Sequence, residues 1–350
     1  MSKEIQIEKF LELSNKTPII DVRSPAEYEQ AHIPGALNLP LFSNEERALV
    51  GTIYKEQGKV KAVLKGLEIV GPKLVSYTKF VLKLKSESIL IHCWRGGMRS
   101  ASMAWLLETV GIKCNILAGG YKNYRSYIRE QLENPYNIIL LGGFTGSGKT
   151  DLLQILDKAG RQIIDLEGIA HHKGSAFGAI GQTAQPTTEM FENILHNHLS
   201  KLDPLKPIWV EDESHNIGKD FIPEPFWLRM RQSPLVVIDA TFEQRLERLV
   251  RDYGSYPIQN LMASIQKIEK RLGYDKCKLA LEACENKDLK TAAQICLIYY
   301  DKAYSSQLTK RFGEKLGTMP KITFDPANSQ EIIEQLDSIA NSLNNTQQKI

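Results

Sequence analysis

The sequence predicts two α/β domains in series, because strand-like and helix-like segments alternate and two of the strands run into glycine-rich loops. The chain has 350 residues, which is enough for two hydrophobic cores. A boundary is expected at Asn134-Pro135, which gives domains 1–134 and 135–350. The expected strands lie at 17–23, 88–91 and 113–117 in the first domain, with a turn into another strand at 32–39, and at 137–141, 162–165, 207–210 and 235–239 in the second.

Helical segments are expected between these strands. The stretch 44–85 combines charged residues with apolar residues at helical spacing. Shorter helices are expected at 101–107, 121–132 and 151–156, and residues 244–316 have a mostly helical pattern. The polar tail after Ser338 is expected to fray.

Composition is typical of a soluble globular protein, with 42% hydrophobic and 24% charged residues. Charged residues are spread through the first nine positions, unlike in a signal peptide. No apolar run approaches the roughly 20 residues of a membrane helix. The five cysteines form no CxxC pair, which disfavours a zinc site and indicates a reducing compartment. We therefore expect a cytoplasmic protein that is not membrane-bound, and we expect a monomer.

Charge is unevenly distributed along the chain. Residues 1–134 contain 19 Lys and Arg against 14 Asp and Glu, which gives +5. Residues 135–224 contain 7 against 12, which gives −5, and residues 225–325 contain 17 against 12, which gives +5. Two basic regions around an acidic one would suit a polyanionic macromolecule, but a solvated surface explains the distribution equally well.

Cys93 follows an apolar strand and opens a loop that leads into a helix. Successive backbone N–H groups at such a helix N-terminus converge on one point, where they bind anions and favour thiolate over thiol. Cys93 is therefore the expected nucleophile, and Arg99 can complete the ring of donors with a bidentate grip on an oxyanion. The expected anion nest consists of Trp94, Arg95, Gly96, Gly97 and Met98.

A second loop follows the strand expected at 137–141 and has the pattern G-x-x-x-x-G-K-[ST]. This is the phosphate loop (P-loop), in which backbone N–H groups cradle phosphates, Lys149 reaches terminal oxygens and the Thr150 hydroxyl ligates magnesium. The cradle recognises any polyphosphate, so the pattern leaves the ligand open. The expected phosphate-binding residues are Gly143, Gly146, Ser147, Gly148, Lys149 and Thr150.

Acidic residues follow two other strands of the second domain, where ligands of parallel sheets usually bind. One of them can hold magnesium through water, although a simple charged loop is the alternative. The sequence does not decide which residue takes this role, and no metal site is certain. The candidates for magnesium or phosphate contact are Asp165, Glu167, Glu211, Asp212 and Glu213.

Two basic groups are candidates for contact with phosphate or with a polyanion such as RNA. His171, His172 and Lys173 lie in a glycine-broken loop, and two histidines alone do not make a metal site. Arginines recur at three-residue spacing on one expected helical face, either as a lid over phosphates or as a solvated surface. These arginines are Arg245, Arg248 and Arg251.

The first half resembles a rhodanese domain. The resemblance rests on Asp21-Val22-Arg23-Ser24-Pro25-Ala26-Glu27-Tyr28, on the Cys93 loop and on the turn Leu117-Ala118-Gly119-Gly120-Tyr121. Arg99 stands one position later than in common sulfur-transfer rhodaneses, which gives the C-x5-R spacing of related phosphatases. A loop of this length admits a larger anion such as phosphate.

A rhodanese domain followed by a P-loop NTPase-like domain with a helical C-terminal part is similar to the bacterial tRNA 2-selenouridine synthases. The resemblance covers nearly the whole chain and includes Asp-Leu-Glu-Gly at 165–168 and Glu-Asp-Glu-Ser at 211–214. It implies a selenotransferase without a tightly bound cofactor that acts on wobble 2-thiouridine in tRNA.

The resemblance also implies the substrates and the steps. Geranyl diphosphate at the phosphate loop would supply a geranyl group to the sulfur, with Lys149 neutralising the leaving diphosphate. Cys93 would take selenium from selenophosphate as S-selanylcysteine, and selenium would then replace the geranylthio group. The partners implied are the tRNA and a supply of selenophosphate.

Two other functions remain open from the residues alone. A C-x5-R phosphatase would use Cys93 as nucleophile and Arg99 as the phosphate clamp, but the loop offers no obvious general acid. A nucleotide kinase regulated by a rhodanese-like sensor domain would explain the phosphate loop differently.

Overall fold

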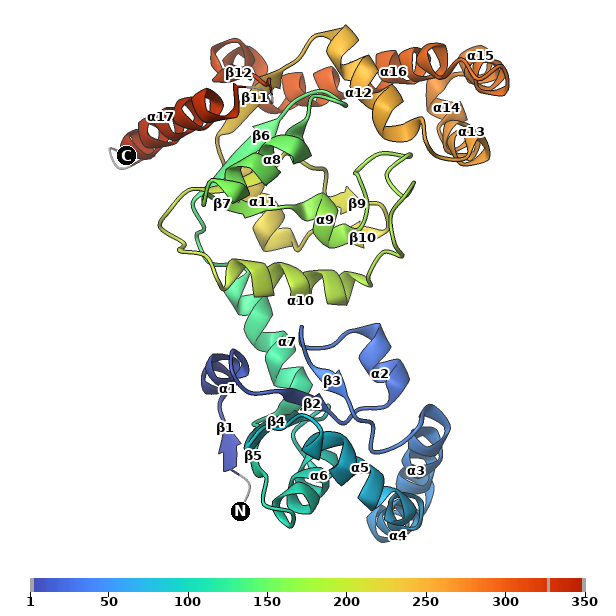
Figure 1. The fold of residues 1–350 in the computed structure, drawn as a ribbon, viewed down its shortest axis with the longest axis vertical. Helices are drawn as coiled ribbons and strands as arrows, with labels where there is room; N and C mark the ends of the chain where they lie inside the picture. The colour runs from blue at the N-terminus through green and yellow to red at the C-terminus, as the bar shows by residue number, and fades with distance from the viewer. Residues whose placement is uncertain (1–2, 326–327, 348–350) are drawn as a thin grey trace. The chain divides into compact units, whose positions relative to one another are not determined.

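The computed structural model describes residues 3–325 and 328–347, and the chain forms two compact units (Figure 1). The first unit contains Met1–Glu133 together with Glu192–Asn197. The second contains Asn134–Phe191 and His198–Ile350. The sequence does not anticipate that a short segment near residue 195 belongs to the first unit. The expected α/β fold class is confirmed for both units.

The first unit is built on a five-stranded parallel sheet with strand order β1-β5-β4-β2-β3. Four of its strands were expected, β3 among them within the stretch 32–39, whereas β1 carries only one buried residue and was missed. The strands are β1 (Lys3–Ile5), β2 (Ile19–Asp21), β3 (Leu37–Asn38), β4 (Ser88–His92) and β5 (Lys113–Leu117).

Helices connect these strands, and their starts follow local sequence signals. Ser24 and Glu27 form a capping box at the start of α2, with Pro25 as its first residue. Ser43 and Glu46 form another at the start of α3. The helical stretch expected at 44–85 is present. The helices are α1 (Ile7–Ser14), α2 (Pro25–Gln30), α3 (Asn44–Gln57), α4 (Lys59–Val70), η1 (Gly71–Lys73), α5 (Leu74–Leu82), α6 (Met98–Glu108) and α7 (Gly120–Gln131).

The second unit contains another five-stranded parallel sheet, with strand order β12-β11-β6-β8-β7, and a two-stranded antiparallel pair β9-β10. The four expected strands are present, whereas β12 lies beyond the helical region and was missed. The strands are β6 (Ile138–Gly142), β7 (Gln162–Ile164), β8 (Ile208–Glu211), β9 (Asn216–Ile217), β10 (Asp220–Phe221), β11 (Leu235–Asp239) and β12 (Lys321–Thr323).

Helices account for most of residues 242–318, as expected. The expectation of a fraying tail after Ser338 is wrong up to residue 347, because the last helix continues to Gln347 and packs Ile339, Ala340 and Leu343 against the core of the sheet; the final three residues lie outside the described part. The helices are α8 (Lys149–Lys158), α9 (Leu166–Ala170), α10 (Thr188–Leu199), α11 (Glu224–Gln232), α12 (Phe242–Tyr253), α13 (Ile258–Lys267), α14 (Glu269–Leu272), α15 (Tyr274–Glu285), α16 (Leu289–Phe312), η2 (Gly313–Thr318) and α17 (Ser329–Gln347).

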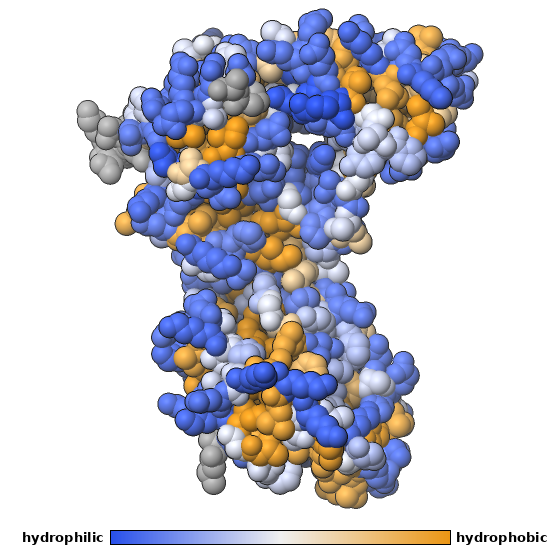
Figure 2. Space-filling view, in the orientation of Figure 1, coloured by the Kyte–Doolittle hydropathy of each residue, from blue (hydrophilic) through white to orange (hydrophobic). Residues whose placement is uncertain are grey.

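Each sheet has its own hydrophobic core, and the second unit has an additional core among α13–α16. Figure 2 shows a largely hydrophilic face with hydrophobic patches, one of them in the area where Figure 1 draws α13–α16. Within the described chain, none of the helices combines the length and apolar character that crossing a membrane requires.

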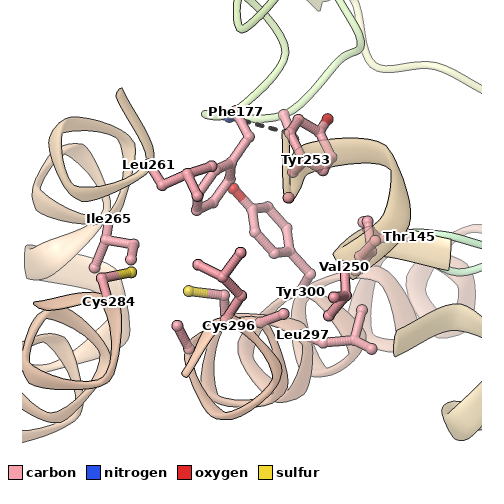
Figure 3. Close-up of a pocket in the computed structure, with 16 residues that line it drawn as sticks. Thr145, Phe177, Val250, Tyr253, Leu261, Ile265, Cys284, Cys296, Leu297 and Tyr300 are labelled. Carbon is pink, nitrogen blue, oxygen red and sulfur yellow. Dashed lines mark hydrogen bonds between the residues drawn. The ribbon is translucent and has the colours of Figure 1, made fainter. Parts of the chain in front are cut away.

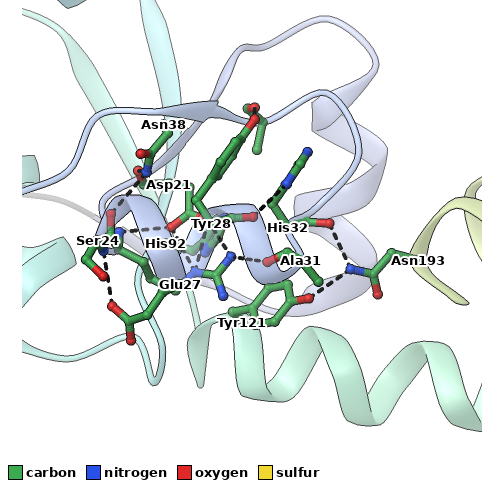
Figure 4. A network of polar contacts seen from close by, with 12 residues as sticks. Asp21, Ser24, Glu27, Tyr28, Ala31, His32, Asn38, His92, Tyr121 and Asn193 are labelled. Atoms are coloured by element: carbon green, nitrogen blue, oxygen red, sulfur yellow. Dashed lines mark hydrogen bonds and ion pairs between the residues drawn. The ribbon is translucent and has the colours of Figure 1, made fainter. Parts of the chain in front are cut away.

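A buried ion pair lies at the end of β2 in the first unit (Figure 4). The Arg23 guanidinium donates to both carboxylate oxygens of Asp21, at 2.6–3.0 Å, and to the carbonyl of Ala31 at 2.8 Å. Although burial opposes ionisation, the neighbouring His92 and then the hydrogen bonds and charge of Arg23 hold the pKa of Asp21 below its ordinary value. The guanidinium carbon also lies 3.8 Å from the ring centre of Tyr121. Arg23 therefore links β2, the end of α2 and the start of α7.

The segment 192–197 of α10 joins the same unit through Asn193. The Asn193 amide donates to the carbonyl of His32 and to the hydroxyl of Tyr121, both at 2.8 Å (Figure 4). Its side-chain oxygen accepts from Arg125, which also pairs with Glu192. The Asn193 side chain thus satisfies buried polar groups of the first unit from a helix far along the chain.

Replacing Arg23 by methionine should destabilise the first unit, because the Asp21 charge would remain buried without its partner. We expect the free energy of opening β2 and β4 to fall by about 3–5 kcal/mol, measured by hydrogen exchange of their amides. Lys9→Met is the control, since Lys9 forms an exposed pair with Glu12 at 2.8 Å and should change this energy by less than ~1 kcal/mol. Equal effects of the two variants would contradict the prediction.

Candidate functional site

The Cys93 loop joins the end of β4 to the start of α6. Cys93 directly follows His92, the last residue of β4, and α6 begins at Met98. The start of α7 lies against the loop, where the N–H of Tyr121 donates to the carbonyl of Cys93 at 2.8 Å. The loop is therefore held between two helix N-termini.

Two glycines allow this close approach. Gly96 has φ +68°, and a Cβ there would lie 2.7 Å from the carbonyl oxygen of Leu117. Gly120 has φ +62°, and its Cβ would lie 2.4 Å from the N of Gly96. Any side chain at either position would separate the Cys93 loop from the turn before α7.

The Cys93 thiol is buried, with 3% of the residue exposed. Burial alone would raise its pKa, but a hydrogen bond with the Ser100 hydroxyl, another from the N–H of Arg95 and the charge of Arg99 outweigh burial. The Sγ–Oγ distance to Ser100 is 3.3 Å. The pKa of Cys93 therefore lies below that of an ordinary thiol, as a nucleophilic cysteine requires.

The residues expected to form the anion nest all lie in this one turn. The side chains of Trp94 and Met98 are exposed, at 37% and 53%. The backbone of the turn, and not these side chains, therefore surrounds the sulfur. Of the expected N–H donors, that of Arg95 reaches the sulfur. The Gly97 carbonyl lies 2.9 Å from the same Ser100 hydroxyl, whose single proton it accepts while Cys93 is a thiol and which turns to the sulfur when the thiolate forms.

Arg99 points to a carboxylate that the sequence did not assign to the site. Its Nη1 lies 2.8 Å from Glu27 Oε2 in α2. Burial raises the pKa of Glu27, but the hydrogen bond and charge of Arg99 outweigh burial, so that the net shift of this pKa is downward. The expected bidentate grip on an oxyanion therefore requires Arg99 to share or leave Glu27. The capping box predicts Glu27 as a helix cap, but no local pattern predicts this pair across 72 positions.

The phosphate loop joins β6 to α8 in the second unit. Gly143 donates its N–H to the Tyr304 hydroxyl at 3.0 Å, and Lys149 Nζ donates to the carbonyl of Gly143 at 3.2 Å. Gly146 and Gly148 have φ +80° and +92°. The expected phosphate-binding residues Gly143 to Thr150 thus form one continuous turn at a helix N-terminus, which suits an anion. Ser147 is buried within this turn.

Two carboxylates lie beside the Thr150 hydroxyl. Its Oγ1 is 3.3 Å from Glu167 Oε2, and Glu167 shares a hydrogen bond with Glu213. Burial and then the charge of Glu167 raise the pKa of Glu213 to about 8. Burial also raises the pKa of Glu167. The pair shares negative charge next to a hydroxyl that can ligate magnesium.

The other acidic candidates have structural partners. Asp165 caps α9 by accepting from the N–H of Gly168 at 2.7 Å. Glu211 is buried and accepts from the backbone N–H groups of Leu166 and Glu167. Asp212 pairs with Arg311 at 2.6 Å, and both side chains are buried. Of the five candidates, Glu167 contacts the Thr150 hydroxyl, and Glu213 is hydrogen-bonded to Glu167.

The expected basic loop does not gather its side chains at one point. His171 has φ +50°, and its Nδ1 lies 2.9 Å from the Thr183 hydroxyl. His172 is buried, and burial lowers its pKa. The Lys173 ammonium lies 5.4 Å from the ring centre of Tyr253. A joint phosphate contact by these three residues finds no support in this geometry.

The three arginines of α12 differ in their surroundings. Arg245 is buried, forms a bidentate pair with Asp301 at 2.7 Å and donates to the Thr145 carbonyl. Arg248 donates to the carbonyl of Gly146 at 2.9 Å. Arg251 is 66% exposed and pairs with its neighbour Asp252. The three arginines therefore lie in different surroundings, since Arg245 and Arg248 contact the phosphate loop whereas Arg251 is exposed. Their contact with phosphate or tRNA stays a prediction.

Family models match both halves of the chain. A model described as the AAA domain of tRNA 2-selenouridine synthase matches residues 136–319, and a rhodanese-like domain model matches residues 6–127. The first match includes the phosphate loop and the two carboxylates beside it. The second includes the Cys93 loop.

Curated relatives match across both units. The tRNA 2-selenouridine synthase of Proteus mirabilis (strain HI4320) is 43% identical over 251 residues, which cover 69% of this chain and 67% of that protein. The synthase of Psychromonas ingrahamii is 34% identical over 336 residues, covering 85% and 89%. That of Pseudomonas fluorescens (strain Pf0-1) is 37% identical over 284 residues, covering 78% and 74%. This chain therefore belongs to the tRNA 2-selenouridine synthase family.

Proposed function

We propose that this protein replaces the sulfur of wobble 2-thiouridine in tRNA by selenium, with selenophosphate as donor and an S-geranyl intermediate made from geranyl diphosphate. The observation that carries the proposal is the lowered pKa of the Cys93 thiol in a chain that also has a phosphate loop. The relatives named above are synthases of 2-selenouridine in tRNA.

The phosphate loop would serve the geranyl step. The sulfur of 2-thiouridine forms a bond to C1 of geranyl diphosphate, the C1–O bond breaks with its electron pair on the diphosphate, and the base loses the N3 proton. Lys149 and the backbone N–H groups of the loop stabilise the diphosphate as its charge grows. The product carries sulfur as a geranylthio group, which leaves more readily than the original sulfur.

Magnesium fits the same place. The Thr150 hydroxyl and the carboxylates of Glu167 and Glu213 are oxygen donors of the kind this ion prefers. Among the described residues, no group of three or more His, Cys, Asp or Glu side chains is arranged to hold a metal ion. Phosphate oxygens and waters would therefore complete its coordination, and the ion would supply charge neutralisation of the diphosphate.

The Cys93 loop would serve the selenium step. The Cys93 thiolate attacks selenium of selenophosphate, the Se–P bond breaks with its electron pair on the phosphorus group, and selenium remains on sulfur. The N–H of Arg95 and the charge of Arg99 favour the thiolate. Selenium then adds at C2 of the base and the geranylthio group leaves as a thiolate. Two thiols must afterwards supply two electrons: the first attacks the Cys93 sulfur, breaks the S–Se bond and leaves selenium on the base, and the second attacks the resulting mixed disulfide and releases Cys93 as the two thiols become a disulfide.

Single variants distinguish the geranyl step from the selenium step. Lys149→Ala should leave 2-thiouridine unmodified, because the diphosphate loses its main counter-charge. Cys93→Ala should accumulate S-geranyl-2-thiouridine without 2-selenouridine, because only selenium uptake is lost. Mass spectrometry of nucleosides from tRNA incubated with protein, selenophosphate and geranyl diphosphate measures all three species.

Matched controls exist for both substitutions. Cys114 is another buried cysteine of the first unit, and Lys158 is exposed in the last turn of α8. Cys114→Ala and Lys158→Ala should both form 2-selenouridine. Unchanged 2-thiouridine with wild-type protein and every donor, together with phosphate release in the absence of tRNA, would instead indicate a phosphatase.

The reactivity of Cys93 should persist to lower pH than that of an ordinary thiol. The thiolate is lost only as pH falls through the lowered pKa, so the midpoint of iodoacetamide alkylation should lie below about 8.5. Ser100→Ala removes a hydrogen bond to sulfur and should move the midpoint upward. Burial raises the pKa of Cys114 to about 12, so this thiol should stay unreactive. A Cys93 midpoint at or above the ordinary value would contradict the assignment.

A further inference from the structure

An apolar pocket lies beside the phosphate loop within the second unit (Figure 3). It contains about 630 Å³ of empty space, a volume that includes open solvent. Thr145, a residue of the phosphate loop itself, belongs to its lining. The pocket therefore begins where the phosphate cradle is.

The pocket has two ends, which Figure 3 separates. Thr145 lies at one end with Val250 and Leu297. The other end is formed by Leu261, Ile265 and Cys284. A ligand with phosphates in the loop would therefore enter beside Thr145 and extend toward α13 and α15.

The lining offers little for hydrogen bonding. The Tyr300 hydroxyl accepts from the N–H of Ala176 at 3.2 Å and also bonds the Ser175 side chain. The carbonyl of Thr145 accepts from Arg245, whose charge Asp301 neutralises. A nucleobase needs free donors and acceptors along its edge, whereas a hydrocarbon chain needs none. The chemistry of the lining favours a hydrocarbon.

The cysteines of the pocket have the same apolar character. Burial raises the pKa of Cys296 to about 12 and that of Cys284 in the same direction. Both thiols are therefore neutral at physiological pH and behave as small hydrophobic groups. Neither competes with a nucleophile for an electrophilic prenyl carbon.

We propose that this pocket holds the geranyl chain while the phosphate loop holds the diphosphate, and that Leu261 and Ile265 limit the chain length accepted. The inference rests on the proposed function for the identity of the ligand. It adds a location for the chain and residues that decide between prenyl groups. A ten-carbon chain enters from the Thr145 end, and its last isoprene unit contacts the wall at α13.

The test compares two leucines of the same helical core. Leu261 and Leu272 are both buried in the core among α13–α16, but only Leu261 lines the pocket. Calorimetric titration measures the affinities of geranyl diphosphate, farnesyl diphosphate and inorganic pyrophosphate for the full chain. Leu261→Ala enlarges the far end and should raise the ratio of farnesyl to geranyl affinity about tenfold. Leu272→Ala should leave this ratio unchanged, because a ratio of affinities is insensitive to general destabilisation.

A filling substitution tests the opposite change. Cys284→Phe should lower the affinity for geranyl diphosphate by about tenfold and leave the affinity for inorganic pyrophosphate unchanged, because only the prenyl chain reaches this end of the pocket. Equal affinity of the wild-type protein for geranyl diphosphate and pyrophosphate would overturn the pocket assignment. So would equal shifts of the ratio in the two leucine variants.

The experiments distinguish failure of the pocket assignment from failure of the geranyl transfer step. Chain-dependent binding that responds to Leu261→Ala, without S-geranyl-2-thiouridine in the mass spectrum, would support the pocket and overturn the geranyl step of the proposed function. Formation of S-geranyl-2-thiouridine with no dependence on Leu261 or Cys284 would retain the proposed function and overturn the pocket.

Discussion

Both candidate sites depend on unpaired backbone N–H groups where a parallel strand ends and a helix begins. A helix leaves its first N–H groups without partners inside the helix, so an anion or a polarised atom is stabilised there. In the Cys93 loop the partner is sulfur, and in the phosphate loop the proposed partner is a diphosphate. The geometry tolerates no side chain at Gly96 or Gly120, because a Cβ would meet backbone atoms within 2.7 Å. The chemistry of the chain therefore follows from backbone packing as much as from its reactive side chains.

The sequence predicts the two loops well, because each is a short local pattern between a strand and a helix. It predicts side-chain partners poorly. Arg99 is 72 positions from Glu27, and Arg311 is 99 positions from Asp212, so no local pattern can pair them. The same limit applies to the sheet edges, since β1 and β12 are three-residue strands that are held by their neighbours. Tertiary packing overrides local propensity in such short elements.

The carboxylates near the phosphate loop differ in whether backbone donors or cations pair with them. Asp212 is paired with Arg311, and Glu211 accepts two backbone N–H groups, so both carboxylates contribute to the fold. Glu167 and Glu213 share a hydrogen bond, Thr150 contacts Glu167, and the charge of Lys149 acts on both. Burial is the main cause of their raised pKa values, and at Glu213 the charge of Glu167 adds to it. A cation arriving with a diphosphate would be stabilised there, whereas a bare anion would depend on Lys149 and the loop.

The five cysteines show how one residue type acquires two roles. All five are free and buried, so burial does not distinguish them. Burial raises the pKa of Cys114, Cys277, Cys284 and Cys296, which lie on strands or helices whose backbone N–H groups are already used. Cys93 follows its strand, where the N–H of Arg95 and the hydroxyl of Ser100 remain available to sulfur. A thiolate can therefore form at one position without exposing the others to the same chemistry. Selenium, which follows the thiolate, would be confined to Cys93 for the same reason.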